Sequence, residues 1–244
     1  MEPCPKRIRV VLGDEVVADS SRTMLLHEMG HQPVHYFPPE DVRADLLEPS
    51  DRHTRCPWKG KASYYTIRAG DRVEEAAAWY YPEPTDSAPP ELRGMIAFYW
   101  GRMDRWLEED EEIRAHPRDP YHRIDIRRSS REVKVSLDGE LLAETRRPHA
   151  LFESGLPVRW YMPREDVLVD LHPSETTSHC PYKGDASYFS AAVPGGEDLV
   201  WYYPDPMPGA RDVQDLVCFW NERVDLTLDG EELERPESPW RHAA

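Results

Sequence analysis

A ten-residue segment that occurs twice constrains the fold of this chain more than any other feature. Residues 56–65 read Cys-Pro-Trp-Lys-Gly-Lys-Ala-Ser-Tyr-Tyr, and residues 180–189 read Cys-Pro-Tyr-Lys-Gly-Asp-Ala-Ser-Tyr-Phe. The match extends toward the N-terminus, where Tyr36 and Tyr161 occupy corresponding positions. Because self-similarity at a fixed separation is the signature of a repeat, the chain is a tandem duplication. We expect its two halves to be related by pseudo-twofold symmetry.

The duplication also suggests domain boundaries. With 244 residues in the chain, each copy has the size of a small domain. An acidic run, residues 108–112, lies between the copies and is typical of a solvated segment. We predict a first β repeat over residues 1–110, a connector over 111–128, a second β repeat over 129–234 and a flexible tail over 235–244.

Short β-rich runs separated by turn residues predict an antiparallel β fold in each copy. The clearest hairpin has alternating apolar and polar side chains over residues 133–137, followed by the turn pair Asp138 and Gly139. The 24 Pro and 13 Gly argue against long helices. We predict a mainly β protein made of two tandem small β-barrel or folded antiparallel-sheet domains. Helix should be scarce, with one turn at residues 24–29, and short strands at 43–47 and 168–172 should lead into polar loops before each signature segment.

Charge and hydropathy argue against two classes of partner. The net charge is −16, so the surface should repel a phosphate backbone, and we expect no nucleic-acid partner. No run of about 18 apolar residues occurs, which predicts no membrane-spanning helix and no membrane partner. No apolar segment of signal-peptide length follows Lys6 and Arg7, so we expect a cytoplasmic protein. The four cysteines lack Cys-x-x-Cys spacing and are expected to be free thiols.

The signature segment places a lysine between Pro and Gly in both copies. A lysine held on such a stiff loop suits binding of a carboxylate or phosphate, or acts as a base or amine nucleophile when desolvated. The alternative is a simple turn, in which Pro fixes φ, Gly adopts a left-handed conformation and the lysine is solvated. Lys59 and Lys183 are better candidates than Cys56 and Cys180, because no base recurs beside the cysteine.

Polar and aromatic residues retained in both copies complete the candidate site. Glu and Tyr suit proton transfer, Arg suits an anionic ligand, and aromatic side chains suit a pocket wall. Arginine–carboxylate pairs also brace small β domains and aromatic residues also fill cores, so structural roles stay open. The candidate catalytic residues are Lys59, Lys183, Glu28, Glu153, Tyr36 and Tyr161, and the candidate ligand-binding residues are Arg22, Arg147, Asp41, Asp166, Trp79, Trp201, Tyr81 and Tyr203.

Three histidines four residues apart suggest a metal site in the first copy. They are His27, His31 and His35. Their counterparts in the second copy are not histidines, and Gly30 breaks any helix that would align them. The chain also has no phosphate-binding glycine loop, dinucleotide fingerprint or nucleophile elbow. We therefore predict no metal and no cofactor.

The repeated segments resemble a known bacterial family. Residues 36–42, 56–65 and 96–99, with their second-half counterparts, are similar to the bacterial domain of unknown function numbered 427. The similarity covers nearly the whole chain as two copies. It implies a compact, mostly β domain of about one hundred residues, often loosely labelled nucleotidyltransferase-like. The resemblance supplies no established reaction and no catalytic set. The chain lacks the paired-aspartate metal motif that would support nucleotidyl transfer, so we do not adopt that label.

Two hypotheses about function follow from the residues. The first is a cofactor-independent enzyme that processes a small molecule by acid–base chemistry, such as isomerisation, cyclisation or addition–elimination, on a polar or anionic organic substrate. The alternative is a non-catalytic ligand-binding or interaction module with a groove in or between the repeats. We expect a monomer rather than a homo-oligomer, because the two halves already supply a composite unit.

Overall fold

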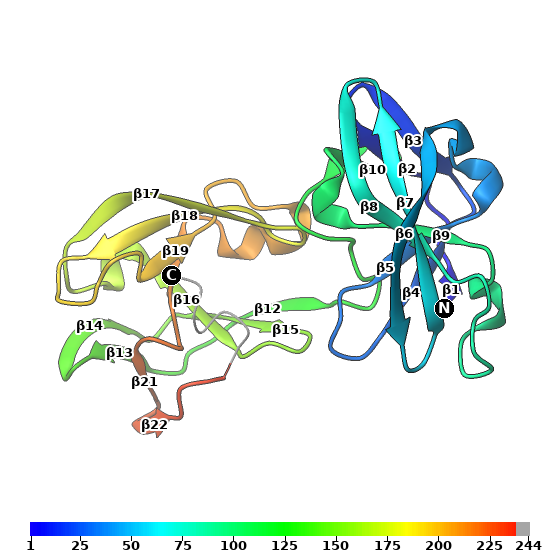
Figure 1. Cartoon of the computed structure of the whole chain (residues 1–244). Helices are drawn as coiled ribbons and strands as arrows, with labels where there is room; N and C mark the ends of the chain where they lie inside the picture. The colour runs from blue at the N-terminus through cyan, green and yellow to red at the C-terminus, as the bar shows by residue number, and fades with distance from the viewer. Residues whose placement is uncertain (238–244) are drawn as a thin grey trace. The chain divides into compact units, whose positions relative to one another are not determined.

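The computed structural model describes residues 1–237 and contains two compact units, the first Met1–Asp119 and the second beginning at Pro120. Their named strands all pair antiparallel and are joined by turns and short 3-10 helices, so the predicted mainly β class is confirmed. The strands of the first unit run from blue to green in Figure 1, and those of the second from green to red. Positions 238–244 of the expected flexible tail lie outside the described residues.

Each unit contains one seven-stranded sheet, and the two sheets have the same strand order. In the first unit the order is β1 Glu2–Pro3, β4 Met24–Leu26, β5 Val34–Phe37, β9 Ile96–Phe98, β8 Arg72–Tyr80, β7 Gly60–Ala69 and β6 Leu47–Cys56. The corresponding order in the second unit is β12 Ile124–Arg128, β15 His149–Glu153, β16 Arg159–Pro163, β20 Leu216–Phe219, β19 Val200–Tyr202, β18 Gly184–Ala191 and β17 Leu171–Cys180.

A four-stranded sheet completes each unit and contains the predicted hairpin. The order is β11 Glu111–Ile113, β10 Arg105–Glu108, β2 Ile8–Leu12 and β3 Glu15–Ser20 in the first unit. It is β22 Glu231–Leu233, β21 Asp225–Leu228, β13 Val133–Leu137 and β14 Glu140–Thr145 in the second. Within the described residues no sheet closes on itself, so each unit adopts the folded antiparallel form rather than the barrel.

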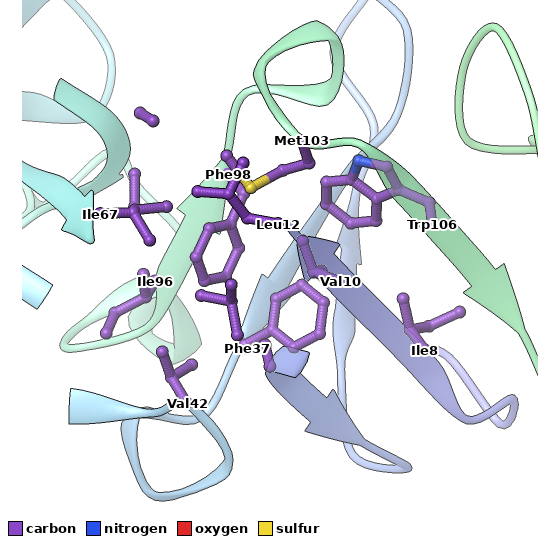
Figure 2. Packing of buried hydrophobic residues seen from close by; sticks show 14 of the residues in the cluster. Ile8, Val10, Leu12, Phe37, Val42, Ile67, Ile96, Phe98, Met103 and Trp106 are labelled. Carbon is purple, nitrogen blue, oxygen red and sulfur yellow. The ribbon is translucent and has the colours of Figure 1, made fainter. Parts of the chain in front are cut away.

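The main core of each unit lies between its two sheets. In the first unit Val10 and Leu12 lie two residues apart and so project from the same side of β2, toward the layer that contains Phe37. Phe37 meets the Phe98 ring edge-on, with centroids 5.5 Å apart, and Trp106 lies beside both (Figure 2). Truncation of an aromatic side chain buried this completely costs about 3–5 kcal/mol.

The opposite face of the seven-stranded sheet carries a second, aromatic cluster. Tyr36 and Tyr81 belong to it in the first unit, and Leu92 and Met95 of the Pro-rich loop after β8 pack on them. Tyr161, Tyr203 and Val213 form the matching cluster in the second unit. The loops that cover this face contain the 3-10 helices η3 Pro90–Leu92 and η6 Pro208–Val213.

The prediction of polar loops before the signature segments is wrong. These residues form β6 and β17, two ten-residue edge strands with mostly exposed side chains. Both contain a proline near the start and an irregular register, between Ser50 and His53 in β6 and at the matching place in β17. An edge strand of this kind buries little surface, so it lacks the apolar alternation that reveals strands in a sequence.

Other expected boundaries also differ from the structure. The helical turn expected at 24–29 is replaced by β4, because Leu25 and Leu26 are buried and pair with β5. The strands expected at 43–47 and 168–172 begin only at Leu47 and Leu171. Strands β11 and β12 lie inside residues 111–128. The remaining 3-10 helices are η1 Pro39–Asp41, η2 Ala44–Leu46, η4 Trp100–Arg102 and η5 Arg164–Asp166.

No helix in the described part of the chain is both long enough and apolar enough to span a membrane. All four cysteines are free, as their spacing predicts, with Cys4 and Cys218 buried and Cys56 and Cys180 half-buried. Burial raises the pKa of the Cys218 thiol to about 12, so this side chain is an inert part of the aromatic cluster.

Candidate functional site

The candidate lysine of each unit lies at the tip of a hairpin. Residues 57–59 connect β6 to β7, and Gly60 pairs with Cys56 across the turn. Gly60 has φ +102°, and a Cβ there would lie 3.1 Å from the Glu83 carbonyl oxygen. Gly184 has φ +101° at the same point of the second unit. Glycine is thus required both by the turn and by the close approach of the Pro-rich loop.

The Pro-rich loop fixes the backbone of both lysines. The Thr85 amide donates to the Lys59 carbonyl at 3.3 Å, and the Met207 amide donates to the Lys183 carbonyl at 2.9 Å. Each hairpin tip is therefore held against the sheet by the segment that covers the aromatic cluster. The sequence left open a simple turn with a solvated lysine. The loop is a turn, but its lysine is not solvated.

The candidate glutamate of each unit lies in the turn between the second and third strands of the seven-stranded sheet. Glu28 begins a turn closed by its carbonyl and the His31 amide, 3.0 Å apart, and Gly30 supplies the left-handed residue. Glu153 and Gly155 repeat this geometry. Both glutamates thus start from equivalent backbone positions.

In both units the lysine and the glutamate form an ion pair. Lys59 Nζ contacts Glu28 Oε2, and Lys183 Nζ contacts both Glu153 oxygens at 2.6 and 2.5 Å. The Glu28 side chain is 31% exposed, whereas the Glu153 side chain is 4% exposed. The two lysine side chains are equally covered, at 13% and 10%. The pair is therefore accessible through its carboxylate in the first unit and sealed in the second.

Tyrosine and tryptophan side chains form the floor beside each ion pair. Trp79 Nε1 donates to the Tyr36 hydroxyl at 3.2 Å, and Trp201 Nε1 donates to the Tyr161 hydroxyl at 3.0 Å. Lys59 Nζ lies 5.8 Å from the centre of the Tyr81 ring. As predicted from strand alternation, Trp79 and Tyr81 share this face, whereas Tyr80 packs in the opposite core.

Burial keeps the site tyrosines protonated. Desolvation raises the pKa of Tyr36 and Tyr81, and the negative charge of Glu28 acts in the same direction. Desolvation likewise raises the pKa of Tyr161 and Tyr203 well above the ordinary value. These hydroxyl groups are hydrogen-bond donors and acceptors at neutral pH, not bases.

The repeated arginine–aspartate pairs lie elsewhere and act as surface braces. Arg22 Nη2 donates to Asp41 Oδ1 at 2.7 Å, and Ser20 donates to the other oxygen at 2.6 Å. Arg147, Asp166 and Thr145 repeat this arrangement. No contact in the described residues joins these pairs to the lysine–glutamate pairs. In the second unit they border an open surface hollow of about 470 Å³, lined by Glu144, Thr145, Arg146, Arg147, Asp166 and Leu168.

The three histidines of the first unit do not gather. His27 Nε2 contacts Glu2 Oε1 at 2.9 Å, whereas His35 is buried beside Trp106. Burial lowers the pKa of His35 to about 4, and neither ring nitrogen has a hydrogen-bond partner. Within residues 1–237, no three His, Cys, Asp or Glu side chains are placed to hold a metal ion.

Two groups of the second unit were missed by the sequence comparison. His122 Nε2 lies 2.8 Å from Glu153 Oε1, and its ring stacks on Tyr182 with centroids 3.9 Å apart. Arg159 forms a buried bidentate pair with Glu222, at 2.8 and 2.7 Å. Neither is repeated in the first unit, so a search for residues retained in both copies passes over them. The only sign of them in the sequence is that they occur in one copy and not in the other.

Comparison with known proteins agrees with the duplicated fold. The family model described as "Domain of unknown function (DUF427)" matches the chain twice, over residues 1–109 and 125–230. The first match ends within unit one and the second starts at Asp125, inside β12. Among curated proteins, none matches the chain.

Proposed function

We propose that this chain, which belongs to the family described as Domain of unknown function (DUF427), is an enzyme. It would process a small polar or anionic molecule by acid–base chemistry without a cofactor. The first unit would carry the reaction. The observation that supports this proposal is the half-open Glu28–Lys59 pair beside Tyr36 and Tyr81. A carboxylate and an ammonium group held together at a surface opening suit proton transfer to and from a bound molecule.

Each residue has a distinct role in this reaction. Glu28 accepts a proton from the substrate, and the Lys59 ammonium stabilises the negative charge that then develops. Return of the same proton to another atom completes an isomerisation or cyclisation. Loss of a leaving group instead completes an elimination. Tyr36 is only 1% exposed, so it would support the site from beneath as a neutral hydroxyl, because burial raises its pKa.

The second unit would act as a scaffold in this proposal. Glu153 accepts hydrogen bonds from Lys183 and His122 and is nearly inaccessible. A substrate would have to displace His122 before it reached the carboxylate. The catalytic roles predicted for Lys183, Glu153 and Tyr161 are therefore assigned to structural support, and the reaction to the first unit.

A specific observation also favours the alternative, a non-catalytic ligand-binding module. Trp58 is 70% exposed and Met29 is fully exposed, and they adjoin Lys59 and Glu28 in the sequence. Large exposed apolar side chains beside a charge pair are typical of a recognition surface. This alternative predicts saturable binding without turnover. In either case we propose a monomeric, cytoplasmic protein that binds small molecules, with neither nucleic acid nor membrane as a partner.

Matched variants of the two units test the proposal. The full-length protein is screened against polar and anionic metabolites for thermal shift and for conversion by mass spectrometry. Turnover should be lost in Glu28→Gln and in Lys59→Ala, while binding of the same compound weakens. The variant Tyr182→Phe changes the second unit outside its ion pair and should retain turnover. Turnover that survives Glu28→Gln contradicts the proposal, and binding without any conversion supports the alternative.

A further inference from the structure

The second unit contains a side chain that occupies the position of a ligand. His122 lies two residues before β12 and inserts its ring at the lysine–glutamate pair. One face of the imidazole stacks on Tyr182 at 3.9 Å, with the rings 18° from parallel. Its Nε2 lies 2.8 Å from Glu153 Oε1, and a carboxylate oxygen only accepts, so the ring nitrogen donates.

The first unit has the same recognition groups without this occupant. Trp58 holds the sequence position of Tyr182 and is 70% exposed. Lys59 contacts only Oε2 of Glu28, and Oε1 has no hydrogen-bond partner among the described residues. In the second unit β12 pairs with β15 over five residues and reaches Glu153, whereas β1 pairs with β4 over only two residues. No described strand therefore extends as far as the Glu28 carboxylate.

We infer that the first unit binds a planar nitrogen heterocycle of the imidazole class, with its ring stacked on Trp58 and a ring N–H donated to Glu28. The second unit is the template for this assignment, since His122 supplies the same ring to the same pair. Lys59 holds the carboxylate in place, as Lys183 does for Glu153. The inference names a substrate class for the proposed function and rests on it only for the chemistry that follows binding.

Three physical requirements narrow the ligand to this class. The stacking contact requires a flat ring, and indole offers a larger face than the phenol of Tyr182. The free carboxylate oxygen requires an N–H donor, which is stronger when the ring is cationic. The adjacent Lys59 ammonium repels other positive charge, so a bulky cation that came close to it would be disfavoured. Imidazole and imidazole-bearing metabolites satisfy all three.

Calorimetric titration of the full-length protein with imidazole is the first test. Wild type should bind one equivalent, and Trp58→Ala should weaken binding about tenfold, because a stacked aromatic contact contributes that factor. Glu28→Gln should weaken it similarly. The probe 1,3-dimethylimidazolium keeps the planar cation but has no N–H, so it should bind more weakly than imidazole. Equal affinity of wild type and Trp58→Ala overturns the inference.

The second unit supplies the matched control. His122→Ala vacates the space between Tyr182 and Glu153, so this variant should bind two equivalents of imidazole. If wild type binds none and His122→Ala binds one, the first unit is not an open copy of the second and the inference is wrong. Should His122→Ala fail to fold, the wild-type and Trp58→Ala titrations still decide it, since Trp58 lies at the surface.

Binding and turnover separate this inference from the proposed function. If imidazole binds at Trp58 but no imidazole-bearing compound is converted, the proposed enzyme activity fails and the binding site stands. If a compound without such a ring is converted in a manner that depends on Glu28, and imidazole does not bind, the activity stands and the ligand class is wrong.

Discussion

The two units share a topology and an ion pair but differ in what surrounds it. In the second unit Glu153 is covered by His122, and Arg159 and Glu222 add a second buried pair against the aromatic cluster. In the first unit Glu28 is accessible. The turns that place the two glutamates are equivalent, so the difference arises from the longer β12, which brings in His122, and from a few side chains outside the repeated motifs.

This difference shows how two copies of one fold can come to expose the same carboxylate to different degrees. One copy fills its site with its own residues and becomes more firmly braced, and the other keeps the site open. An open site leaves a carboxylate with a hydrogen-bonding vacancy, which a ligand can satisfy. The most informative changes are therefore made in pairs, one in each unit, and their effects should be unequal in ways the structure specifies.

The largest effect is expected at the pair that only the second unit has. Glu222→Gln leaves the Arg159 guanidinium buried without its partner charge, and loss of one member of a buried pair costs about 3–5 kcal/mol. Arg102→Gln, at the corresponding position of the first unit, should cost only about 1 kcal/mol, because that side chain is exposed and loses a surface hydrogen bond to the Glu75 carbonyl. Denaturant-dependent hydrogen exchange, read peptide by peptide, measures each unit in the intact chain.

The lysine–glutamate pairs should respond unequally to the same substitution. Glu153→Gln removes the partner of a buried ammonium and should destabilise the second unit by about 3–4 kcal/mol. Glu28→Gln should destabilise the first by less than about 1 kcal/mol, since solvent screens the more exposed pair. The same exchange measurement applies. Equal losses would mean that the two sites are equally closed.

Acid should destabilise the first unit through His35. Burial lowers the pKa of His35 to about 4 in the folded protein, against about 6.5 in an unfolded chain. Between these values only the unfolded state binds the proton, so stability is complete above about pH 6.5 and decreases as the pH falls toward 4, by about 3 kcal/mol in total.

His35→Phe should remove this part of the acid sensitivity. The second unit has Trp160 at the corresponding position and needs no such change. The measurement is the free energy of unfolding of wild type and variant from pH 7 to pH 4. Parallel curves for the two proteins would show that His35 takes up its proton without unfolding.

The smallest and most symmetrical effects are expected at the surface braces. The hydrogen bond from Arg147 holds the pKa of Asp166 below its ordinary value. Desolvation raises the pKa of Asp41, but the hydrogen bonds from Arg22 and Ser20 and the charge of Arg22 together outweigh it, so the pKa is lowered. Asp41→Asn and Asp166→Asn should each cost about 1 kcal/mol at neutral pH, and part of the wild-type advantage should disappear below about pH 4. Thermal unfolding of the two variants measures this, and a clear difference between them would break the equivalence.

The repeat made much of the fold predictable from the sequence. The two hairpins whose turns contain Gly13 and Gly139 could be predicted from β-rich runs on either side of the turn residues. The shared face of Trp79 and Tyr81 followed from strand alternation. Strands β6 and β17 were not predictable, because an exposed edge strand buries too little to show a pattern. Residues 24–26 were ambiguous because short apolar runs fit a helix or a strand equally.

The candidate site was predictable only where the two copies agree. Glu28 and Lys59 were found because both recur, and the structure joins them although 30 residues lie between them. Arg22 and Asp41 recur equally well and lie elsewhere, since repetition does not distinguish a brace from a site. His122 was invisible because it belongs to one copy, and its contact with Glu153 depends on how β12 enters the sheet.

Carboxyl labelling tests most directly the claim that one site is open and the other is filled from within. The folded protein is treated with a water-soluble carbodiimide and an amine, and labelling of Glu28 and Glu153 is followed by peptide mass spectrometry. Glu28 should be labelled several times faster than Glu153, and His122→Ala should accelerate labelling at Glu153 without changing Glu28. Equal rates at the two glutamates in wild type, or no effect of His122→Ala, would contradict the account.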